Sequence, residues 1–265
     1  MVLLHGLSES AEVVSDLVVG VAAGGVRVVA VDLRGHGRSG HADRYRHNDY
    51  AADVARVIEQ VSTGPVVVFG HSLGGVVAVS LAQSRPELVA GLVLGDPPLF
   101  EGDPGVRAAS ASARAHSDMV ARIRQWQASG ISGSRLAAEL GRRPSPHHGQ
   151  RLHDMLTASS LAAWSTALLA FDPAAMDASI TGELWAGFDP DQPLQCSTLV
   201  IRADPGLGAV FTPEHARRVL AATPTASTAL VPGVSHWLYL EATGLTATVQ
   251  EILSFTASLG PRSHG

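Results

Sequence analysis

Short apolar runs rich in Val, Ile and Leu alternate along this chain with longer segments of helical periodicity. Apolar runs of this kind, bounded by turn residues, are typical of parallel strands buried on both faces by helices. The pattern therefore predicts an α/β fold, with a mostly parallel sheet flanked by helices. The predicted strands are residues 2–4, 26–31, 66–69, 92–94, 199–201 and 227–231.

The segments between these runs predict helices. A proline at the first position of a helix is favourable, and Pro213 marks such a start. The predicted helices are residues 9–23, 49–61, 74–83, 214–222 and 245–257.

The alternation of strand and helix stops after Pro97 and Pro98 and resumes only near Cys196. The interruption is too long for a plain loop. Residues 106–140 and 150–169 are rich in helix formers, and a basic, proline-rich break at 142–148 separates them. We expect a helical lid inserted after the strand ending near Leu94, above the carboxyl edge of the sheet. The predicted core is 1–98 and 195–265, and the predicted lid is 99–194.

The strongest chemical signal is the run Gly-His-Ser-Leu-Gly-Gly at residues 70–75. It stands directly after a predicted strand and directly before a predicted helix, where G-x-S-x-G forms a sharp turn that exposes the serine hydroxyl. No lysine follows the glycines, which argues against a phosphate-binding loop. The pattern predicts Ser72 as a nucleophile.

A serine hydroxyl needs an imidazole to accept its proton as it attacks a carbonyl. His236 lies in a loop just after the last predicted strand. In folds that carry a G-x-S-x-G turn between strand and helix, the base follows the nucleophile and comes last in the chain. His71 precedes the nucleophile, and we expect it to support the turn. His147 and His148 lie in the basic break, where we expect them to be solvated.

The tetrahedral intermediate of such a reaction needs backbone N–H donors aimed at its oxyanion. One donor comes from the loop after the first predicted strand, and the other from the residue after the nucleophile. We assign Leu7, with Gly6 beside it, and Leu73.

The composition and net charge of the chain argue against some classes of binding partner. Of 265 residues, 46% are hydrophobic and 16% charged, as in globular proteins, and a net charge of -5 without a like-charged block offers nothing to a nucleic acid or an anionic membrane. The chain contains no run of 18 apolar residues, so the sequence predicts no membrane span. The single cysteine, Cys196, is expected to be an inert core thiol, which suits a reducing cytoplasm.

These motifs, with Asp-Leu-Arg-Gly-His-Gly-Arg-Ser at 32–39 and His5-Gly6, resemble the α/β-hydrolase superfamily over nearly the whole chain except the insertion. The resemblance implies an α/β-hydrolase fold. It also implies a third catalytic residue, an acid, which in most members follows the strand predicted here at 199–201. That place holds Asp204 at a position that is generally supportive, while the usual acid position is not acidic. Asp96, after the strand at 92–94, stands at an alternative acid position used by some members, including lactonases. We favour Asp96 and keep Asp204 as the alternative.

The resemblance also implies one or two strands before the His-Gly loop, whereas Met1 stands inside that strand. Either the sheet edge is trimmed, which favours a homodimer because strand groups are exposed, or the natural start lies upstream.

The expected reaction is hydrolysis of a small-molecule carboxylic ester or lactone through an acyl-enzyme, without a metal or organic cofactor. Serine at the elbow argues against dehalogenase and epoxide hydrolase chemistry, for which relatives have Asp there. Carbon–carbon bond hydrolysis of the meta-cleavage type, acyl transfer and ligand binding by a receptor with residual activity remain alternatives. The expected walls of the substrate site are Trp126, Trp164, Trp185 and Leu168.

Overall fold

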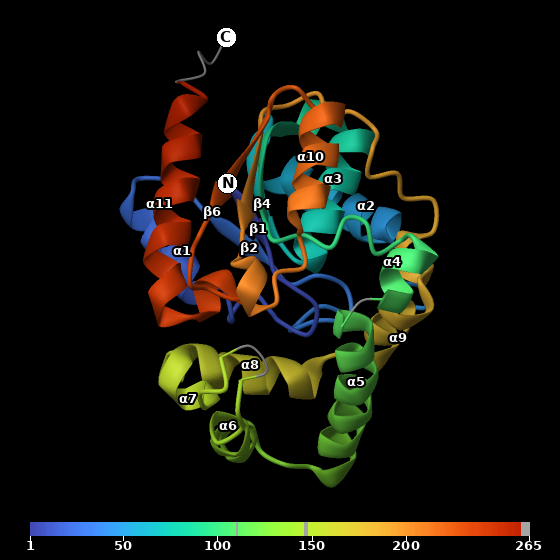
Figure 1. The fold of residues 1–265 in the computed structure, drawn as a ribbon, viewed down its shortest axis with the longest axis vertical. Coiled ribbons are helices and arrows are strands. Elements are labelled where there is room, and N and C mark those ends of the chain that lie inside the picture. The colour runs from blue at the N-terminus through green and yellow to red at the C-terminus, as the bar shows by residue number, and fades with distance from the viewer. Residues whose placement is uncertain (110, 146–147, 261–265) are drawn as a thin grey trace.

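The structure is a computed structural model that describes residues 1–109, 111–145 and 148–260. One sheet runs through its upper part (Figure 1), and its six strands pair in the order β2-β1-β3-β4-β5-β6, all parallel. Both the parallel sheet and its helical flanks confirm the predicted fold class. The strands are β1 (Val2–Leu4), β2 (Val29–Val31), β3 (Val66–His71), β4 (Val89–Gly95), β5 (Thr198–Arg202) and β6 (Ala226–Leu230).

Helices cover both faces of this sheet. In Figure 1, α1 and α11 lie on one side, and α2, α3 and α10 lie on the other. Strands buried in this way are apolar along their whole length, and every residue of β4 is buried. The covering helices are α1 (Ser15–Ala23), α2 (His47–Val61), α3 (Leu73–Ser84), α10 (Pro213–Ala222) and α11 (Ala242–Ser258), with 3₁₀ turns at Pro86–Leu88, Pro205–Leu207 and Leu238–Leu240.

A group of helices between β4 and β5 forms the lower part of the molecule in Figure 1. We call it the insertion. Because β4 leads into it, it lies at the carboxyl end of the sheet. Its elements are α4 (Pro104–Ala109), α5 (Ala111–Ser129), α6 (Gly133–Gly141), α7 (Leu152–Met155), α8 (Ala158–Ala170), α9 (Pro173–Thr181) and a 3₁₀ turn at Glu183–Trp185.

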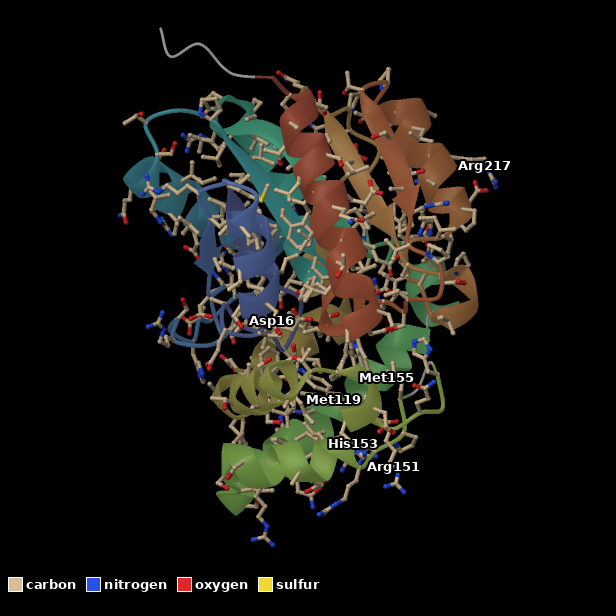
Figure 2. The ribbon with its side chains drawn as sticks, turned by 90° about the vertical axis from the view of Figure 1, so that its left-hand side faces the viewer. Asp16, Met119, Arg151, His153, Met155 and Arg217 are labelled. Carbon is tan, nitrogen blue, oxygen red and sulfur yellow. The ribbon has the colours of Figure 1, made fainter. Side chains whose placement is uncertain are left out.

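Asp16 of α1 ties the insertion to the sheet domain at the boundary seen in Figure 2. Its Oδ2 accepts hydrogen bonds from the hydroxyls of Thr157 and Ser159, both at 3.2 Å, at the start of α8. Thr157 also caps α8 by accepting the N–H of Ser160 at 3.0 Å. A second tie joins Tyr45 to Asp172, the N-cap of α9.

Tertiary contacts shift several predicted boundaries. The helix predicted at 9–23 begins only at Ser15, because the residues before it form turns, in which Val13 N–H donates to the carbonyl of Ser10 and Ser15 N–H donates to that of Glu12. The strand predicted at 26–31 is limited to Val29–Val31, which is the length that pairs with β1. The helix predicted at 150–169 is broken at Leu156, which forms a β-bridge with Glu241.

The basic break and the cysteine differ from what the sequence predicts. The expectation that His148 is solvated is wrong, because its side chain is only 15% exposed and its Nε2 lies 3.3 Å from Glu241 Oε2. His147 lies outside the described residues. Cys196 is half-buried rather than a core residue. None of the helices in the described part of the chain is long and apolar enough to cross a membrane.

The helix α3 approaches β1 closely at Gly74. A Cβ at Gly74 would lie 2.3 Å from the carbonyl oxygen of Leu4, so Gly74→Ala should lower the free energy of unfolding by roughly 3 kcal/mol through overpacking. Gly64→Ala is the matched control, because no atom lies within 4 Å of its Cβ position, and its effect should stay within about 0.5 kcal/mol. Urea unfolding measures both, and equal values for the two variants would contradict the close packing.

Candidate active site

Ser72 lies at a tight bend between β3 and α3. Its φ is 50°, a left-handed conformation that a non-glycine residue adopts only where its surroundings hold it. Small neighbours are required, because a Cβ at Gly70 would lie 2.2 Å from the carbonyl oxygen of Gly74. The serine N–H donates to the carbonyl of Gly95 at 3.0 Å, which fastens the bend to the end of β4.

Three side chains from distant parts of the chain meet at this bend. Ser72 Oγ lies 3.0 Å from His236 Nε2, and His236 Nδ1 lies 2.7 Å from Asp96 Oδ2. An ionised carboxylate only accepts hydrogen bonds, so Nδ1 carries the proton and Nε2 is left to accept from the serine hydroxyl. This tautomer and this order of contacts are what a serine nucleophile with an imidazole base requires.

Asp96 is completely buried at the end of β4, with a φ of 39°. Its carboxylate accepts the N–H of Val210 at 2.8 Å and the N–H of Phe211 at 3.2 Å, in addition to His236. A buried carboxylate needs such donors because it has lost its hydration. These two amides belong to the segment that follows β5, and no motif in the sequence signals them.

Asp204, the other candidate acid, serves a different part of the structure. Its Oδ1 accepts the N–H of Gly206 at 2.9 Å and its Oδ2 accepts the N–H of Gly233 at 2.9 Å. These hydrogen bonds, that from Gly233 first, lower the pKa of Asp204. Because Gly233 belongs to the loop that carries His236, Asp204 supports that loop, while Asp96 is the carboxylate that accepts the imidazole N–H.

The backbone N–H groups assigned to the oxyanion differ in whether they are already hydrogen-bonded within the protein. Leu73 is the first residue of α3, so its N–H has no acceptor within the helix. Leu7 lies in the turn after β1. The N–H of Gly6 donates to Glu9 Oε2 at 3.0 Å and is therefore engaged. The assignment of Leu7 and Leu73 stays a prediction, and Gly6 shapes the loop beside them.

The four expected wall residues are buried but lie in different places. The ring of Trp164 in α8 lies 5.7 Å, between centroids, from that of Trp237, the neighbour of His236. Trp126 is covered by the guanidinium of Arg143 at 5.2 Å, and Leu168 is fully buried in α8. Trp185 lies against Gly102. Of the four, Trp164 is thus the residue that the structure brings to the loop of the base.

Buried histidines hold the loops around the site. His5 accepts the N–H of Leu33 at its Nε2 and donates to the carbonyl of Gly6 from Nδ1, at 3.1 and 2.8 Å. His36 Nδ1 donates to the carbonyl of Arg34 at 2.8 Å, while its Nε2 has no partner among the described residues. Burial, together with the nearby His5, lowers the pKa of His36 to about 3. Both imidazoles are therefore neutral at pH 7.

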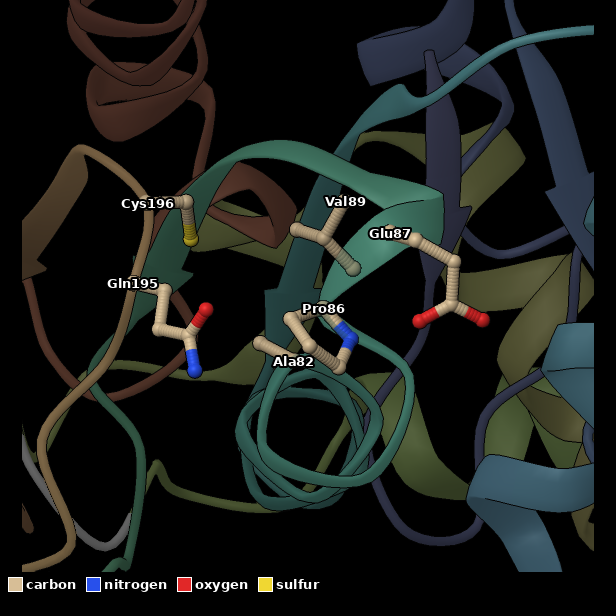
Figure 3. Close-up of a pocket in the computed structure, with 6 residues that line it drawn as sticks. All are labelled: Ala82, Pro86, Glu87, Val89, Gln195 and Cys196. Carbon is tan, nitrogen blue, oxygen red and sulfur yellow. The ribbon is translucent and has the colours of Figure 1, made fainter.

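Two cavities lie away from Ser72. One of about 310 Å³, shown in Figure 3, is lined by Ala82, Pro86, Glu87, Val89, Gln195 and Cys196, near the start of β4. Another of about 350 Å³ borders β2 and includes Asp32, Ser39, His41 and Asp53. Within the described ranges, no group of three or more His, Cys, Asp or Glu side chains is arranged to hold a metal ion.

Comparison with known proteins places the chain in a family. A model described as "Alpha/beta hydrolase family" matches residues 1–249. Lipase LipV of Mycobacterium tuberculosis is 46% identical over 72 residues, which are 27% of this chain and 28% of that protein. The sn-1-specific diacylglycerol lipase ABHD11 of Danio rerio is 35% identical over 97 residues, 36% of this chain and 31% of its own length. The chain thus matches about a third of the length of these relatives.

Solved structures share the fold over almost the whole chain. An E-2-(acetamidomethylene)succinate hydrolase is 21% identical with a TM-score of 0.69, covering 97% of this chain and 91% of its own. A laboratory-evolved variant of potato epoxide hydrolase is 19% identical with a TM-score of 0.76, covering 97% and 92%. A thermophilic esterase from Thermogutta terrifontis is 20% identical with a TM-score of 0.66, covering 98% and 90%. At these identities the likeness concerns the fold alone.

The two aspartates can be separated by the reactivity of Ser72 toward a fluorophosphonate. We expect Asp96→Asn to slow labelling by about 1,000-fold or more, since the imidazole loses its orienting carboxylate. Asp204→Asn should change the rate by less than about 10-fold. Thermal unfolding of both variants checks that they are folded. Equal labelling rates for the two folded variants would contradict the role of Asp96.

Burial of neutral His36 should make the protein sensitive to acid. The unfolded chain takes up a proton at this residue below about pH 6.5, while the folded protein does so only near its pKa of about 3, so stability falls as the pH decreases. Between pH 7 and pH 4 this residue should remove about 3 kcal/mol of unfolding free energy. His36→Asn should show a correspondingly smaller decrease in urea unfolding, and an unchanged decrease would refute this role of His36.

Proposed function

This chain belongs to the alpha/beta hydrolase family, and we propose that it is a serine hydrolase that cleaves carboxylic esters or lactones. One observation carries the proposal. Ser72 Oγ lies 3.0 Å from an imidazole nitrogen of His236, whose other nitrogen lies 2.7 Å from the buried carboxylate of Asp96. A hydroxyl, an imidazole and a carboxylate linked in this order at a strand-turn-helix bend are the groups that an acyl-enzyme mechanism needs.

In the first half of the proposed reaction, Ser72 attacks the carbonyl carbon of the substrate. His236 Nε2 accepts the hydroxyl proton and then gives it to the leaving alcohol, and Asp96 stabilises the imidazolium that exists between these steps. The N–H groups of Leu7 and Leu73 donate to the oxyanion. In the second half, water attacks the acyl-enzyme with His236 again as the base, and the acid is released.

Support for an ester substrate comes from the chemistry of the site and from the relatives. Two similar proteins are named lipases, and a structural neighbour is named an esterase. A serine at the elbow suits an acyl-enzyme, which water must then hydrolyse. We propose that the insertion acts as the lid at 99–194, and that Trp164 borders the acyl or alcohol group beside Trp237. Trp126, Trp185 and Leu168 then shape the lid from within.

The proposal also covers the kind of substrate, the oligomeric state and the location of the protein. We propose a small-molecule substrate, because a net charge of -5 gives little attraction to a nucleic acid backbone. A homodimer and a cytoplasmic location are also proposed, the latter because a single cysteine suits a reducing compartment. The proposed mechanism uses side chains and backbone amides of this chain alone.

Turnover of p-nitrophenyl esters tests the proposal. The wild type should turn over repeatedly, and because the acyl-enzyme precedes hydrolysis it should first release a burst of nitrophenol equal to the enzyme if deacylation is the slower step. Ser72→Ala should lower kcat by about 10⁶-fold while remaining folded. Stoichiometric release without further turnover on any ester or lactone would instead favour a receptor. Activity only on carbon–carbon substrates would favour a meta-cleavage-type hydrolase, and activity only with an added alcohol acceptor would favour an acyltransferase.

A further inference from the structure

Three polar side chains from distant segments meet beneath the proposed catalytic residues. Glu9, His71 and Tyr239 are 5%, 1% and 3% exposed. The Tyr239 hydroxyl donates to Glu9 Oε2 at 2.6 Å. His71 Nδ1 lies 3.5 Å from Glu9 Oε1 and 3.2 Å from the Tyr239 oxygen. Polar groups buried this deeply are retained only when their partners satisfy them, and here each one has a partner.

Hydrogen bonding indicates that His71 carries two protons. Its Nε2 lies 2.8 Å from the carbonyl oxygen of His236, which only accepts. Its Nδ1 faces the Glu9 carboxylate and an oxygen of Tyr239 whose proton is given to Glu9. With the tyrosine proton given to Glu9, both ring nitrogens face acceptors, and an imidazolium satisfies them both.

The electrostatics agree with an ion pair. Burial alone would raise the pKa of Glu9, but the charge of His71 and the hydrogen bonds from His71, Tyr239 and Gly6 outweigh it and lower this pKa to about 2. Burial would also lower the pKa of His71, but the Glu9 carboxylate and the carbonyl of His236 outweigh it and raise this pKa. The pair is thus held charged inside the protein.

Each member of this group also holds a different segment of the proposed active site. Glu9 accepts the N–H of Gly6 at 3.0 Å, in the loop that presents Leu7. His71 directly precedes Ser72 in the sequence. The centroid of its ring lies 4.9 Å from that of the His236 ring. Tyr239 lies in the 3₁₀ turn Leu238–Leu240 that follows the base. One buried group therefore contacts the oxyanion loop, the nucleophile bend and the loop of the base.

We propose that Glu9, His71 and Tyr239 form a charged positioning network that holds these three segments in register for the reaction at Ser72. The inference rests on the proposed function and deepens it, because it assigns positioning roles to residues that do not touch the reacting atoms. His71 contacts the backbone carbonyl of His236, while Asp96 contacts the imidazole ring of His236. The two contacts together define where the imidazole stands.

The network also predicts a pH dependence. Besides Glu9 and Tyr239, the charged or titratable groups that face His71 are His5, Asp96 and His236. Because the pKa of His71 is raised, the ion pair is complete below the ordinary histidine range and is lost as the pH rises through the raised value. Because the pKa of Glu9 is about 2, the carboxylate side of the pair fails only in strong acid. Activity should therefore show an alkaline decrease that depends on His71.

Three variants test the network. Glu9→Gln keeps the shape of the side chain but removes its charge. His71→Gln keeps an N–H that can reach the carbonyl of His236, whereas His71→Ala keeps none. We expect kcat on a p-nitrophenyl ester to fall by about 10- to 100-fold in Glu9→Gln and further in His71→Ala, with KM changed by less than about threefold. His71→Gln should recover part of the loss and should lack the alkaline decrease.

His47→Gln is the matched control for loss of a buried histidine. His47 Nδ1 lies 2.8 Å from Ser80 Oγ and its Nε2 lies 3.2 Å from the carbonyl of Ala186, away from the proposed site. This variant should lose thermal stability with kcat within about twofold of the wild type. All rates are measured well below the melting temperature of each variant. A kcat for Glu9→Gln equal to that of His47→Gln, or an alkaline decrease that persists in His71→Gln, would overturn the network.

A readout independent of activity separates this inference from the proposed function. In ¹⁵N-histidine NMR, His71 should titrate above the ordinary histidine range in the wild type and below it in Glu9→Gln. If His71 titrates identically in both proteins, the network is wrong whatever the enzyme does. If the shift is observed but the wild type hydrolyses no ester and Ser72 is not labelled, the ion pair stands, the proposed function fails, and the positioning role fails with it.

Discussion

The hydrogen bond between His236 and the buried carboxylate of Asp96 is the interaction on which the site depends. A carboxylate with no exposed surface is costly unless several donors surround it, and Asp96 has three: the imidazole and the N–H groups of Val210 and Phe211. Its backbone has a φ of 39° at the end of β4, a conformation that a non-glycine residue keeps only where its surroundings hold it. The segment after β5, the loop after β6 and the end of β4 are therefore joined at one charged group.

The same principle extends across the carboxyl end of the sheet. Parallel strands bring their carboxyl ends to one edge, so the residues that follow β1, β3 and β4 become neighbours although they are distant in sequence. Ser72 follows β3, Asp96 follows β4, and the loop with Gly6 and Leu7 follows β1. Buried charges then fix these loops: Glu9 and His71 on one side of His236, and Asp96 on the other. Asp204 performs a similar task at the surface by accepting the N–H of Gly233.

The parts of the fold that local pattern determines could be predicted from the sequence. The parallel sheet follows from the apolar runs, and the position of Ser72 follows from a motif that is local to one turn. The onset of α1 at Ser15 and the break at Leu156 could not be predicted, because turns before Ser15 and a bridge between Leu156 and Glu241 override helical propensity there. Glu9 and Tyr239 were missed for a related reason: they are 230 residues apart, and each alone resembles an ordinary polar residue in a loop. The preference for Asp96 over Asp204 rested on strand position, and only the side-chain contacts show which of the two faces the imidazole.

The most direct measurement is the proton on Nδ1 of His236, observed by ¹H NMR of the protein labelled with ¹⁵N-histidine. We predict a far-downfield resonance, bonded to Nδ1, that is retained in Asp204→Asn and disappears in Asp96→Asn. A proton found on Nε2, or a resonance that survives the loss of Asp96 and disappears with Asp204, would contradict the central claim that Asp96 orients the base toward Ser72.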